Sequence, residues 1–371
     1  MSSARASLRD RVSLRERRAV ASLEPLEPRR LLANIVVNTA VDESIANATT
    51  SLREAMAQAA GSGADDVITF SATAFPFGSS HTITLTAGQL SIPSGGGKMT
   101  IDGPGPATLT VDGDGASRVF NVAGGANAVI QDITITDGHV IGDGGAIANA
   151  GTLLLSNVTL TGNLAEGAAG SIIAPAGGSA HGGAISNSGH LIIEASRVTD
   201  NVVRGGAGAS TLAGDGDGGV AQGGAVFSAG GTLQVRRTDL VDNQARGGAG
   251  ELGFAGGGLG GVAEGGAIYV SGSALSVADS SLQSNRAVGG AGGAALAAAT
   301  AGGAGGDANG GAIYVTSSSA TISWSDVESN SATAGAGGGG AIGAAGGTAR
   351  GGAIVATDGL SILGGSLADN A

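Results

Sequence analysis

The chain contains no cysteine and few of the large side chains from which globular cores are usually built. The absence of cysteine excludes disulfides, zinc–thiolate sites and a cysteine nucleophile, and it leaves the redox compartment open. Aromatic residues make up only 2% of the 371 residues, whereas glycine alone supplies 72. A core of bulky side chains is therefore excluded, and a layered core of small and aliphatic residues is expected.

Basic residues are concentrated at the beginning of the chain. Residues 1–30 contain eight Arg against four acidic residues, a balance of +4 within a total of −12, so the remainder carries −16. An acidic body argues against nucleic acid as a partner. The basic stretch precedes the first apolar strand and has the character of a targeting segment. No run of 18 apolar residues occurs, so no transmembrane segment is predicted.

A repeat dominates the rest of the sequence. Six times, a glycine pair followed by Ala and a β-branched residue opens a segment that closes 19 or 20 residues later on an asparagine. The first glycines of the openings are Gly144, Gly182, Gly223, Gly265, Gly310 and Gly351. The closing residues are Asn163, Asn201, Asn243, Asn285, Asn330 and Asn370. Such a period predicts a solenoid, in which each unit is stable only when it is stacked on its neighbours.

Aliphatic residues keep a fixed phase relative to each closing asparagine. The positions three, eight and ten residues before it, and the one after Gly-Gly-Ala, carry Leu, Ile or Val in 23 of 24 instances, with Ala320 as the exception. The positions ten and eight residues before the asparagine are two apart, so in a strand their side chains lie on the same face. From eight to three the spacing is odd, which would turn the side chains of a continuous strand to opposite faces, so the chain must bend between them. Three short strands per circuit predict an all-β fold, a single-stranded right-handed parallel β-helix (β-solenoid) of the pectin-lyase-like type.

The asparagines and the segments between repeats complete this prediction. Asn tolerates left-handed backbone angles, so we expect the closing asparagines to stand at a corner and to pair with one another in a ladder. Between each asparagine and the next glycine pair lie 18 to 24 residues rich in Gly and Ala. These segments either project from one corner as a stacked fringe or add a weak extra coil. Their lack of phased aliphatics favours projection.

Three regions are predicted along the chain, and the last of them has two parts. They are a disordered export or targeting segment (1–33), an N-terminal cap with a helix (34–81, helix 52–60) and the parallel β-helix (82–371), which divides into irregular coils (82–143) and six regular repeats with Gly-rich loops (144–371). In the helix, Ser51 and Glu54 form a capping box and Gly61 ends the last turn. This short capping helix would cover the open end of the solenoid.

Three segments resemble known bacterial surface families. Leu26 to Leu32, LEPRRLL, resembles the LEPR-XLL motif of large surface proteins, which implies export. The stretch from 34 to 70, with SLREAMAQAA in its centre, resembles the CSLREA domain, although Thr50 replaces the family's Cys. The GGA[IV] opening with the [LV]xxN closing, over 144–370, resembles the polymorphic outer-membrane protein repeat, in which Phe stands where this chain has Leu or Val. That last resemblance implies a β-helix at the cell surface.

Parallel β-helices include pectate-lyase-like enzymes, so an enzyme is one alternative for this chain. Those enzymes gather aspartates and a basic residue on one strand face. The nearest counterparts in this chain are Asp132 with Asp137, and Asp239 with Asp242 beside Arg236 and Arg237. Each of them also fits a solvated strand or turn position, so no catalytic residue is assigned.

Metal and cofactor sites receive no assignment either. The four histidines, which show no metal-ligand spacing and are expected in loops or at the surface, are His81, His139, His181 and His190. GDGDGG at 214–219 resembles a calcium-binding turn in which Asp215 and Asp217 would be ligands, but it occurs once. Calcium therefore remains the weaker alternative to a flexible acidic loop.

Three rings with polar tips occur in the repeats. Tyr269 and Tyr314 each follow the inward Ile of their repeat, so strand alternation turns both outward. Trp324 is the third such residue. Outward rings either stack on sugars or cover neighbouring side chains.

The sequence thus predicts a secreted or cell-surface β-helical protein of a bacterium, extracellular or at the outer membrane. We expect it to be adhesive or structural and non-catalytic, with surface glycans or envelope proteins as partners. The alternative is a polysaccharide lyase or hydrolase of the pectin-lyase-like fold acting on acidic glycans. The last closing asparagine is followed by one residue, Ala371, and we expect the array to belong to a longer protein.

Overall fold

The computed structural model describes residues 33–45, 47–210, 216–254, 256–297 and 300–371. The chain divides into Met1–Arg30 and Leu31–Ala371, and all described residues belong to the second unit. The expected export segment up to residue 32, including LEPRRLL, lies outside the described residues, as does Asp215. Within the described ranges, no helix has the length and apolarity needed to cross a membrane.

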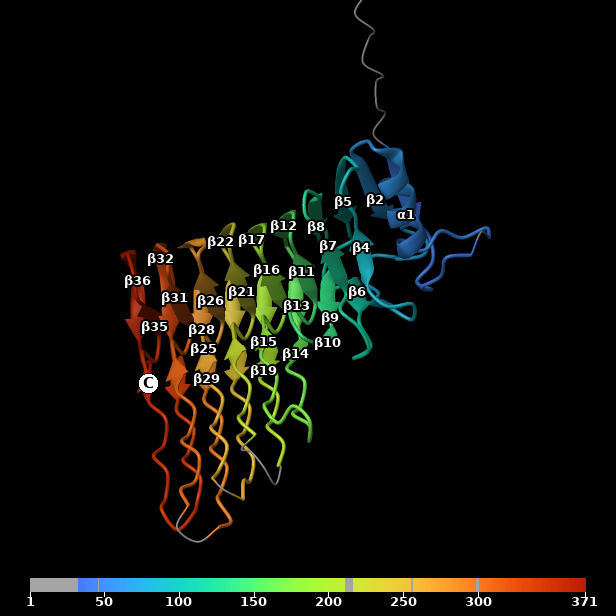
Figure 1. Ribbon diagram of the computed structural model, residues 1–371. Coiled ribbons are helices and arrows are strands. Elements are labelled where there is room, and N and C mark those ends of the chain that lie inside the picture. Colours follow the sequence, from blue (N-terminus) through green and yellow to red (C-terminus); the bar gives the residue numbers. More distant parts are fainter. Residues whose placement is uncertain (1–32, 46, 211–215, 255, 298–299) are drawn as a thin grey trace, which may run out of the picture. The chain divides into compact units, whose positions relative to one another are not determined.

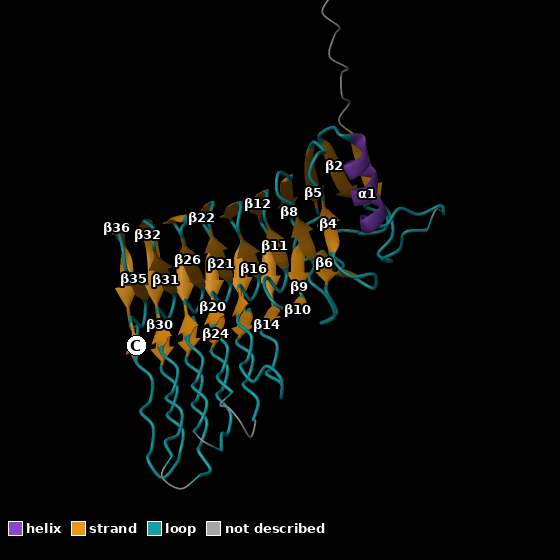
Figure 2. Cartoon of the chain, in the orientation of Figure 1, coloured by secondary structure: helices purple, strands orange, loops and turns teal. Residues whose placement is uncertain are grey.

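The second unit is the right-handed parallel β-helix that the repeat predicts. All its strand pairs are parallel, and each strand pairs with its equivalent in the next coil (Figure 1). A coil contains three core strands, one from sheet B followed by two from sheet A. Two narrower sheets, C and D, follow the asparagine corner and precede the next glycine pair (Figure 2).

Sheet A has 17 strands in two series, which join because β32 and β36 run through both. The first series consists of β1 (Ala33–Val37), β2 (Asp66–Phe70), β5 (Lys98–Asp102), β8 (Asn127–Gln131), β12 (Thr152–Ser156), β17 (His190–Glu194), β22 (Thr232–Arg236), β27 (Ala274–Ala278), β32 (Ala320–Glu328) and β36 (Leu360–Ala368). The second consists of β3 (His81–Thr84), β6 (Leu109–Asp112), β9 (Thr134–Thr136), β13 (Thr159–Thr161), β18 (Arg197–Thr199), β23 (Asp239–Val241) and β28 (Ser281–Gln283).

Sheets B, C and D each take one strand from every coil they span. Sheet B consists of β4 (Leu90–Ile92), β7 (Phe120–Val122), β11 (Ile147–Asn149), β16 (Ile185–Asn187), β21 (Val226–Ala229), β26 (Ile268–Ser271), β31 (Ile313–Thr316) and β35 (Ile354–Ala356). Sheet C consists of β10 (His139–Ile141), β14 (Leu164–Glu166), β19 (Val202–Arg204), β24 (Gln244–Arg246), β29 (Arg286–Val288) and β33 (Ser331–Thr333). Sheet D consists of β15 (Ala180–His181), β20 (Ala221–Gln222), β25 (Ala263–Glu264), β30 (Ala308–Asn309) and β34 (Ala349–Arg350).

The helix α1 (Leu52–Ser62) packs over the first coil. Its capping box is present, since Ser51 Oγ accepts from Glu54 N at 3.1 Å and Ser51 N donates to Glu54 Oε2 at 2.9 Å. The helix runs two residues beyond the expected 52–60, because Gly61 stays helical and Gly63 ends it with φ 63°. Within the predicted N-terminal cap, 34–81, β1 pairs with β2 and β2 with β5, all in parallel, so these strands extend sheet A.

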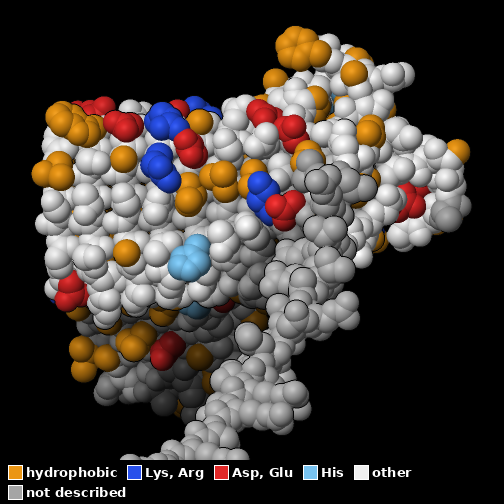
Figure 3. All heavy atoms as spheres, turned by 90° about the horizontal axis from the view of Figure 1, so that it is seen from above, with side chains coloured by type: hydrophobic (Ala, Val, Ile, Leu, Met, Phe, Trp, Pro, Cys, Tyr) orange, Lys and Arg blue, Asp and Glu red, His pale blue; other side chains and the backbone are white. Residues whose placement is uncertain are grey.

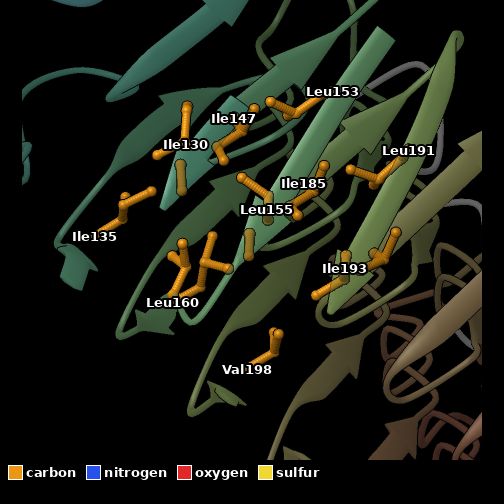
Figure 4. Packing of buried hydrophobic residues seen from close by; sticks show 14 of the residues in the cluster. Ile130, Ile135, Ile147, Leu153, Leu155, Leu160, Ile185, Leu191, Ile193 and Val198 are labelled. Atoms are coloured by element: carbon orange, nitrogen blue, oxygen red, sulfur yellow. The ribbon is translucent and has the colours of Figure 1, made fainter. Parts of the chain in front are cut away.

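The core consists of aliphatic side chains stacked in register. Leu153 pairs with Leu191 and Leu155 with Ile193, and all four are buried. Figure 4 shows such side chains, labelled from Ile130 to Val198, lying one behind another inside successive coils. In the last coil the equivalents Leu360, Ile362 and Leu367 are 38 to 50% exposed, because only one neighbouring coil covers them. The phased positions of the sequence are therefore the core.

Besides the first glycine of each opening pair, which has φ of 59 to 70°, each coil has two left-handed corners. The first lies six residues before each closing asparagine, where the parity change required a bend, and has φ near 50° in Asn157, Ala195, Arg237, Asp279 and Trp324. The second lies at the residue just before the asparagine and has φ of 52 to 67° in Gly162, Asp200, Asp242, Ser284, Ser329 and Asp369. The expected left-handed asparagine is therefore wrong by one position.

The asparagine ladder itself is confirmed. Asn243 Nδ2 donates to Asn285 Oδ1 at 3.0 Å and to the carbonyl of Val198 at 2.9 Å. Its Oδ1 accepts from Asn201 Nδ2 at 3.0 Å and from Asn201 N at 3.2 Å. Interior asparagines of the ladder are buried, and these four bonds satisfy the amide completely. The polar ladder thus lies inside the solenoid without unpaired groups.

The Gly-rich segments project from the asparagine corner, the arrangement that the sequence favoured (Figure 1). We call the described residues within 164–181, 202–222, 244–264, 286–309 and 331–350 the arm. At its base, sheets C and D face each other across a second small core. That core consists of buried residues that are almost all alanine, Ala165, Ala180, Val203, Ala221, Ala245, Ala263, Ala287, Ala308 and Ala332.

Beyond this alanine core, the arm is a hydrogen-bonded lattice of glycine backbones. Outgoing and returning segments alternate in it, so that Gly248 N donates to Gly219 O at 2.8 Å and Gly290 N to Gly261 O at 2.9 Å. Backbone hydrogen bonds from one coil to the next recur at every third residue, as from Gly247 N to Val288 O and from Gly250 N to Ala291 O. Three residues per turn without internal hydrogen bonds is the geometry of the polyproline II helix. The lattice explains the glycine content, because a Cβ on Gly248 would lie 2.0 Å from the carbonyl oxygen of Gly206.

Replacing Asn243 with alanine should lower the free energy of unfolding by about 2–4 kcal/mol, because two buried donors of Asn201 lose their acceptor. Urea unfolding followed by circular dichroism measures this. Asn370→Ala is the control, since its ladder bonds lie at the last coil, where water reaches them. A loss as large for Asn370→Ala as for Asn243→Ala would contradict the role of burial.

Replacing Gly248 with alanine should open the arm and leave the core coils intact. The added methyl group has no space between backbones, and overpacking of this kind costs about 1–3 kcal/mol or more. Hydrogen exchange should therefore accelerate in peptides from 202–264 and stay unchanged in β17 and β22. Ala249→Val is the matched control, because Ala249 is exposed. Equal exchange in the two variants would show that the lattice does not hold the arm.

Candidate functional site

Most of the candidate catalytic residues stand at the left-handed corners. Asp132 and Asp137 have φ of 57 and 48°, and Arg237 and Asp242 have φ of 49 and 55°. Asp132 accepts a hydrogen bond from Asn157 Nδ2 in the next coil. Aspartate suits such corners because its short polar side chain tolerates the left-handed region. Their recurrence in the sequence is thus a consequence of coil geometry.

The remaining two candidates also find partners close by. Asp239 lies 4.0 Å from Arg197, in the preceding coil, and Arg236 Nη2 donates to Gln234 Oε1 at 2.8 Å. Arg237 forms an ion pair with Glu194. On the face seen in Figure 3, acidic and basic side chains lie next to one another. Two of the six candidates, Asp239 and Arg237, thus form ion pairs between coils, and among the described residues no hydrogen bond or ion pair joins a candidate aspartate to Arg236 or Arg237.

The histidines lie in different coils. His190 Nδ1 is 3.0 Å from Thr232 Oγ1, and the ring of His81 packs edge-on against Phe75. His181 Nδ1 lies 2.7 Å from Asp143 Oδ1. Asp217, the described member of the expected calcium turn, accepts from Leu259 N at 2.7 Å. Among the described residues, no three His, Asp or Glu side chains are grouped so that they could hold a metal ion.

The outward tyrosines belong to a ladder of stacked rings at the corner between sheets B and D. Phe227 and Tyr269 have centroids 5.2 Å apart and planes within 9°, and Tyr269 and Tyr314 are 5.5 Å apart and within 12°. His181 extends the ladder, 4.6 Å from Phe227. Neighbouring rings cover one another's faces, and Tyr269 is only 8% exposed. The rings therefore cover each other and offer no broad face to a sugar.

Trp324 stands apart from this ladder. It occupies a left-handed corner, is 71% exposed, and its ring lies over Gly364 of the next coil. A single indole on one coil makes an isolated surface contact.

The concave site with the most distinctive side chains lies where the arm begins, beside β10. This pocket of about 380 Å³ is lined by Gln89, Ala116, Ser117, Arg118, His139, Val140 and Ile141. Arg118 precedes β7, whose Phe120 points into the core, and His139 opens β10. The coil before the arm ends in a short loop at 113–117. The first strand of sheet C, β10, lies against this loop, and the pocket lies between them.

Arg118 is the main polar group of the pocket. Its guanidinium donates to the carbonyls of Asp143 and Gly144 at 2.6 and 2.9 Å and to Gln89 Oε1 at 2.9 Å. All three acceptors are neutral. Burial lowers the pKa of Arg118 from its ordinary value, and the charge of Asp143 opposes that shift. The guanidinium thus clamps the loop before β11 while keeping its positive charge free of a hydrogen-bonded carboxylate.

The other polar groups of the pocket are His139 and Ser117. His139 Nδ1 lies 3.0 Å from the carbonyl of Gly115, and its Nε2 is 3.4 Å from Glu166 Oε2 without hydrogen-bond geometry. The Ser117 hydroxyl donates to a backbone carbonyl and meets no base. Cationic and amide groups beside aliphatic Val140 and Ile141 suit a small polar ligand with acceptor oxygens. Sequence reasoning missed Arg118 because it precedes the regular array and has no counterpart in the repeats.

The tyrosine ladder makes a prediction about pH. Burial, and next the charge of Glu264, raise the pKa of both Tyr269 and Tyr314 above the ordinary value of 10.0. The unfolded chain then loses phenolic protons at a lower pH than the native chain, so stability should fall as pH rises above 10. These are the two tyrosines of the chain, so phenolate absorbance reports on them alone. Native midpoints should exceed those in denaturant, and equal midpoints would contradict the burial of the rings.

Comparisons with known proteins yield similarity of fold alone. No protein-family model and no curated protein match the chain. Among solved structures, it is similar to the pectate lyase Pel9A, with 14% identity and a TM-score of 0.39 over 81% of this chain and 64% of that one. It is also similar to the Escherichia coli protein YbhC, with 13% identity and a TM-score of 0.34 over 83% of this chain and 77% of that one. The chain thus spans 64% of the lyase, and neither likeness bears on its activity.

Proposed function

We propose that this chain is an exported, non-catalytic β-helix that acts at the bacterial cell surface as an adhesive or structural protein. One observation carries the proposal. The charged residues that a reaction would need are used at corners and in ion pairs between coils, as for Arg237 with Glu194 and Arg197 with Asp239. What remains for function is the outward face of each sheet and the arm, which are surfaces for contact.

The sequence supports export independently of this argument. The LEPRRLL segment and the 34–70 stretch resemble segments of bacterial surface proteins, and the repeats resemble those of polymorphic outer-membrane proteins. A fold held together by hydrogen bonds and aliphatic packing without cysteine also suits an extended surface structure, because it is independent of the redox state. The arm adds contact area without adding large side chains to the core.

Fractionation of the source cells tests location. The full chain should be found in the envelope or the medium, and deletion of residues 1–32 should retain it inside the cell. Cytosolic chain with an intact N-terminus would contradict export. The described coils should fold in both cases, which circular dichroism of the purified chains verifies.

The competing function, a polysaccharide lyase or hydrolase, makes a different prediction. Acidic glycans incubated with the purified chain, with and without calcium, should show no cleavage. Cleavage that is lost in Asp239→Asn or in Arg236→Gln would overturn the non-catalytic proposal, because it would assign a reaction to residues that the structure pairs locally.

A further inference from the structure

The outward face of sheet C carries a row of arginines in an otherwise acidic protein. Arg204 on β19 and Arg246 on β24 are register partners, and Arg286 on β29 stands beside Gln244 of β24. All three arginines are exposed. We call Arg204, Arg246 and Arg286 the arginine row. Each of three successive coils contributes one of these cations.

These charges are poorly neutralised by the protein. Arg204 lies 3.6 Å from Glu166, but Arg246 and Arg286 have no ion-pair partner within 4.0 Å among the described residues. Arg246 Nε donates instead to neutral Gln244, at 2.6 Å. Like charges on register partners, here Arg204 and Arg246, repel each other and destabilise the pairing of their strands. The chain has more acidic than basic residues, so an acidic partner at one of these positions would be the ordinary choice. Repulsion between exposed arginines lowers the stability of the fold, and a locally unfavourable arrangement of this kind is typical of a binding surface.

The row also shows how an anion fits it. Glu166 lies between two basic side chains, with His139 Nε2 at 3.4 Å and Arg204 at 3.6 Å from its carboxylate oxygens. A carboxylate or sulfate placed farther along, between Arg246 and Arg286, would repeat this arrangement with an external group. Neighbouring strands are about 4.8 Å apart, so Arg246 follows Arg204 along the axis of the solenoid. Arg286, the partner of Gln244, lies one coil farther and is displaced by two residues along its strand.

We propose that the arginine row binds a linear anionic polysaccharide that runs along the coils, with its carboxylate or sulfate groups over Arg204, Arg246 and Arg286. This deepens the proposed surface function and rests on it. One cation per coil suits a glycan chain that carries its charges ring by ring. Duplex DNA, with one charge per about 1.7 Å, is far denser. It would also meet the acidic side chains of the adjoining face of sheet A, such as Asp326 and Glu328.

Binding of the full chain to polygalacturonate, to a sulfated dextran and to neutral dextran tests the proposal and separates carboxylate from sulfate as the recognised group. The wild type should bind at least one anionic polymer and not the neutral one. Arg246→Gln with Arg286→Gln should weaken binding by about tenfold or more, because two charge-assisted contacts are lost. The dependence of log K on log salt should flatten by about 1 to 2.

The matched control is Arg197→Gln with Arg350→Gln, which removes the same charge from the faces of sheets A and D. It should change binding less than about twofold if the row is the site. Thermal unfolding checks the fold, and the midpoint of the Arg246 and Arg286 variant should stay equal or rise, because like-charge repulsion is relieved.

Three outcomes would overturn the inference. They are absence of binding to every anionic glycan, equal loss in the two double variants, and binding of duplex DNA as tight as that of the glycan. Location separates this test from that of the proposed function. If the chain is found at the cell surface but binds no anionic glycan, the arginine row is not a binding site. If the chain binds the glycan but is found in the cytosol, the proposed surface function is wrong.

Discussion

Parallel hydrogen bonding between successive coils is the constraint on which the rest of the structure depends. It places each residue directly over its equivalent in the next coil, about 4.8 Å away. A side chain at a given position of the repeat therefore has to pack against an equivalent side chain in the coil above and in the coil below. Leu over Leu and Ile over Ile satisfy this condition by apolar contact. Asparagine satisfies it through an amide that both donates and accepts, so that Asn201, Asn243 and Asn285 form a closed series of bonds.

The arm applies the same constraint without side chains. Sheets C and D are too narrow to hold large residues between them, and alanine fills the gap. Farther out even alanine is too large at positions such as Gly247, Gly248 and Gly250, and backbone bonds such as Gly248 N to Gly219 O replace side-chain packing. Glycine loses the most conformational entropy on ordering, so an isolated segment of this composition would not hold a fixed shape. Stacking on the arm segments of neighbouring coils supplies the bonds that offset this loss.

Much of this could be predicted from the sequence, because a repeat shows its phase directly. The aliphatic positions, the bend between Leu155 and Leu160, the asparagine ladder and the projection of the Gly-rich segments all follow from spacing. The order within the arm could not be predicted, since its alanines carry no strand-like alternation against bulkier residues. The covering of the tyrosine faces depends on ring orientation, which alternation does not specify. Arg118 lies outside the repeats, and the arginine row combines two different phases, third after the asparagine for Arg204 and Arg246 and first for Arg286.

Register stacking also shapes what kind of function the fold supports. A catalytic centre needs different residues to converge on one point, and a regular array spreads similar residues along a line. An enzyme built on such coils must break the repeat locally to assemble its site. In the described residues of this chain, the breaks in pattern lie where the arm starts, at Arg118 and His139, and they produce a pocket without a paired nucleophile and base. The regular part instead presents rows, and a row is complementary to a ligand that is itself linear and repeating. Recognition of a polymer along the coils is thus the function that the constraint on the fold most directly permits.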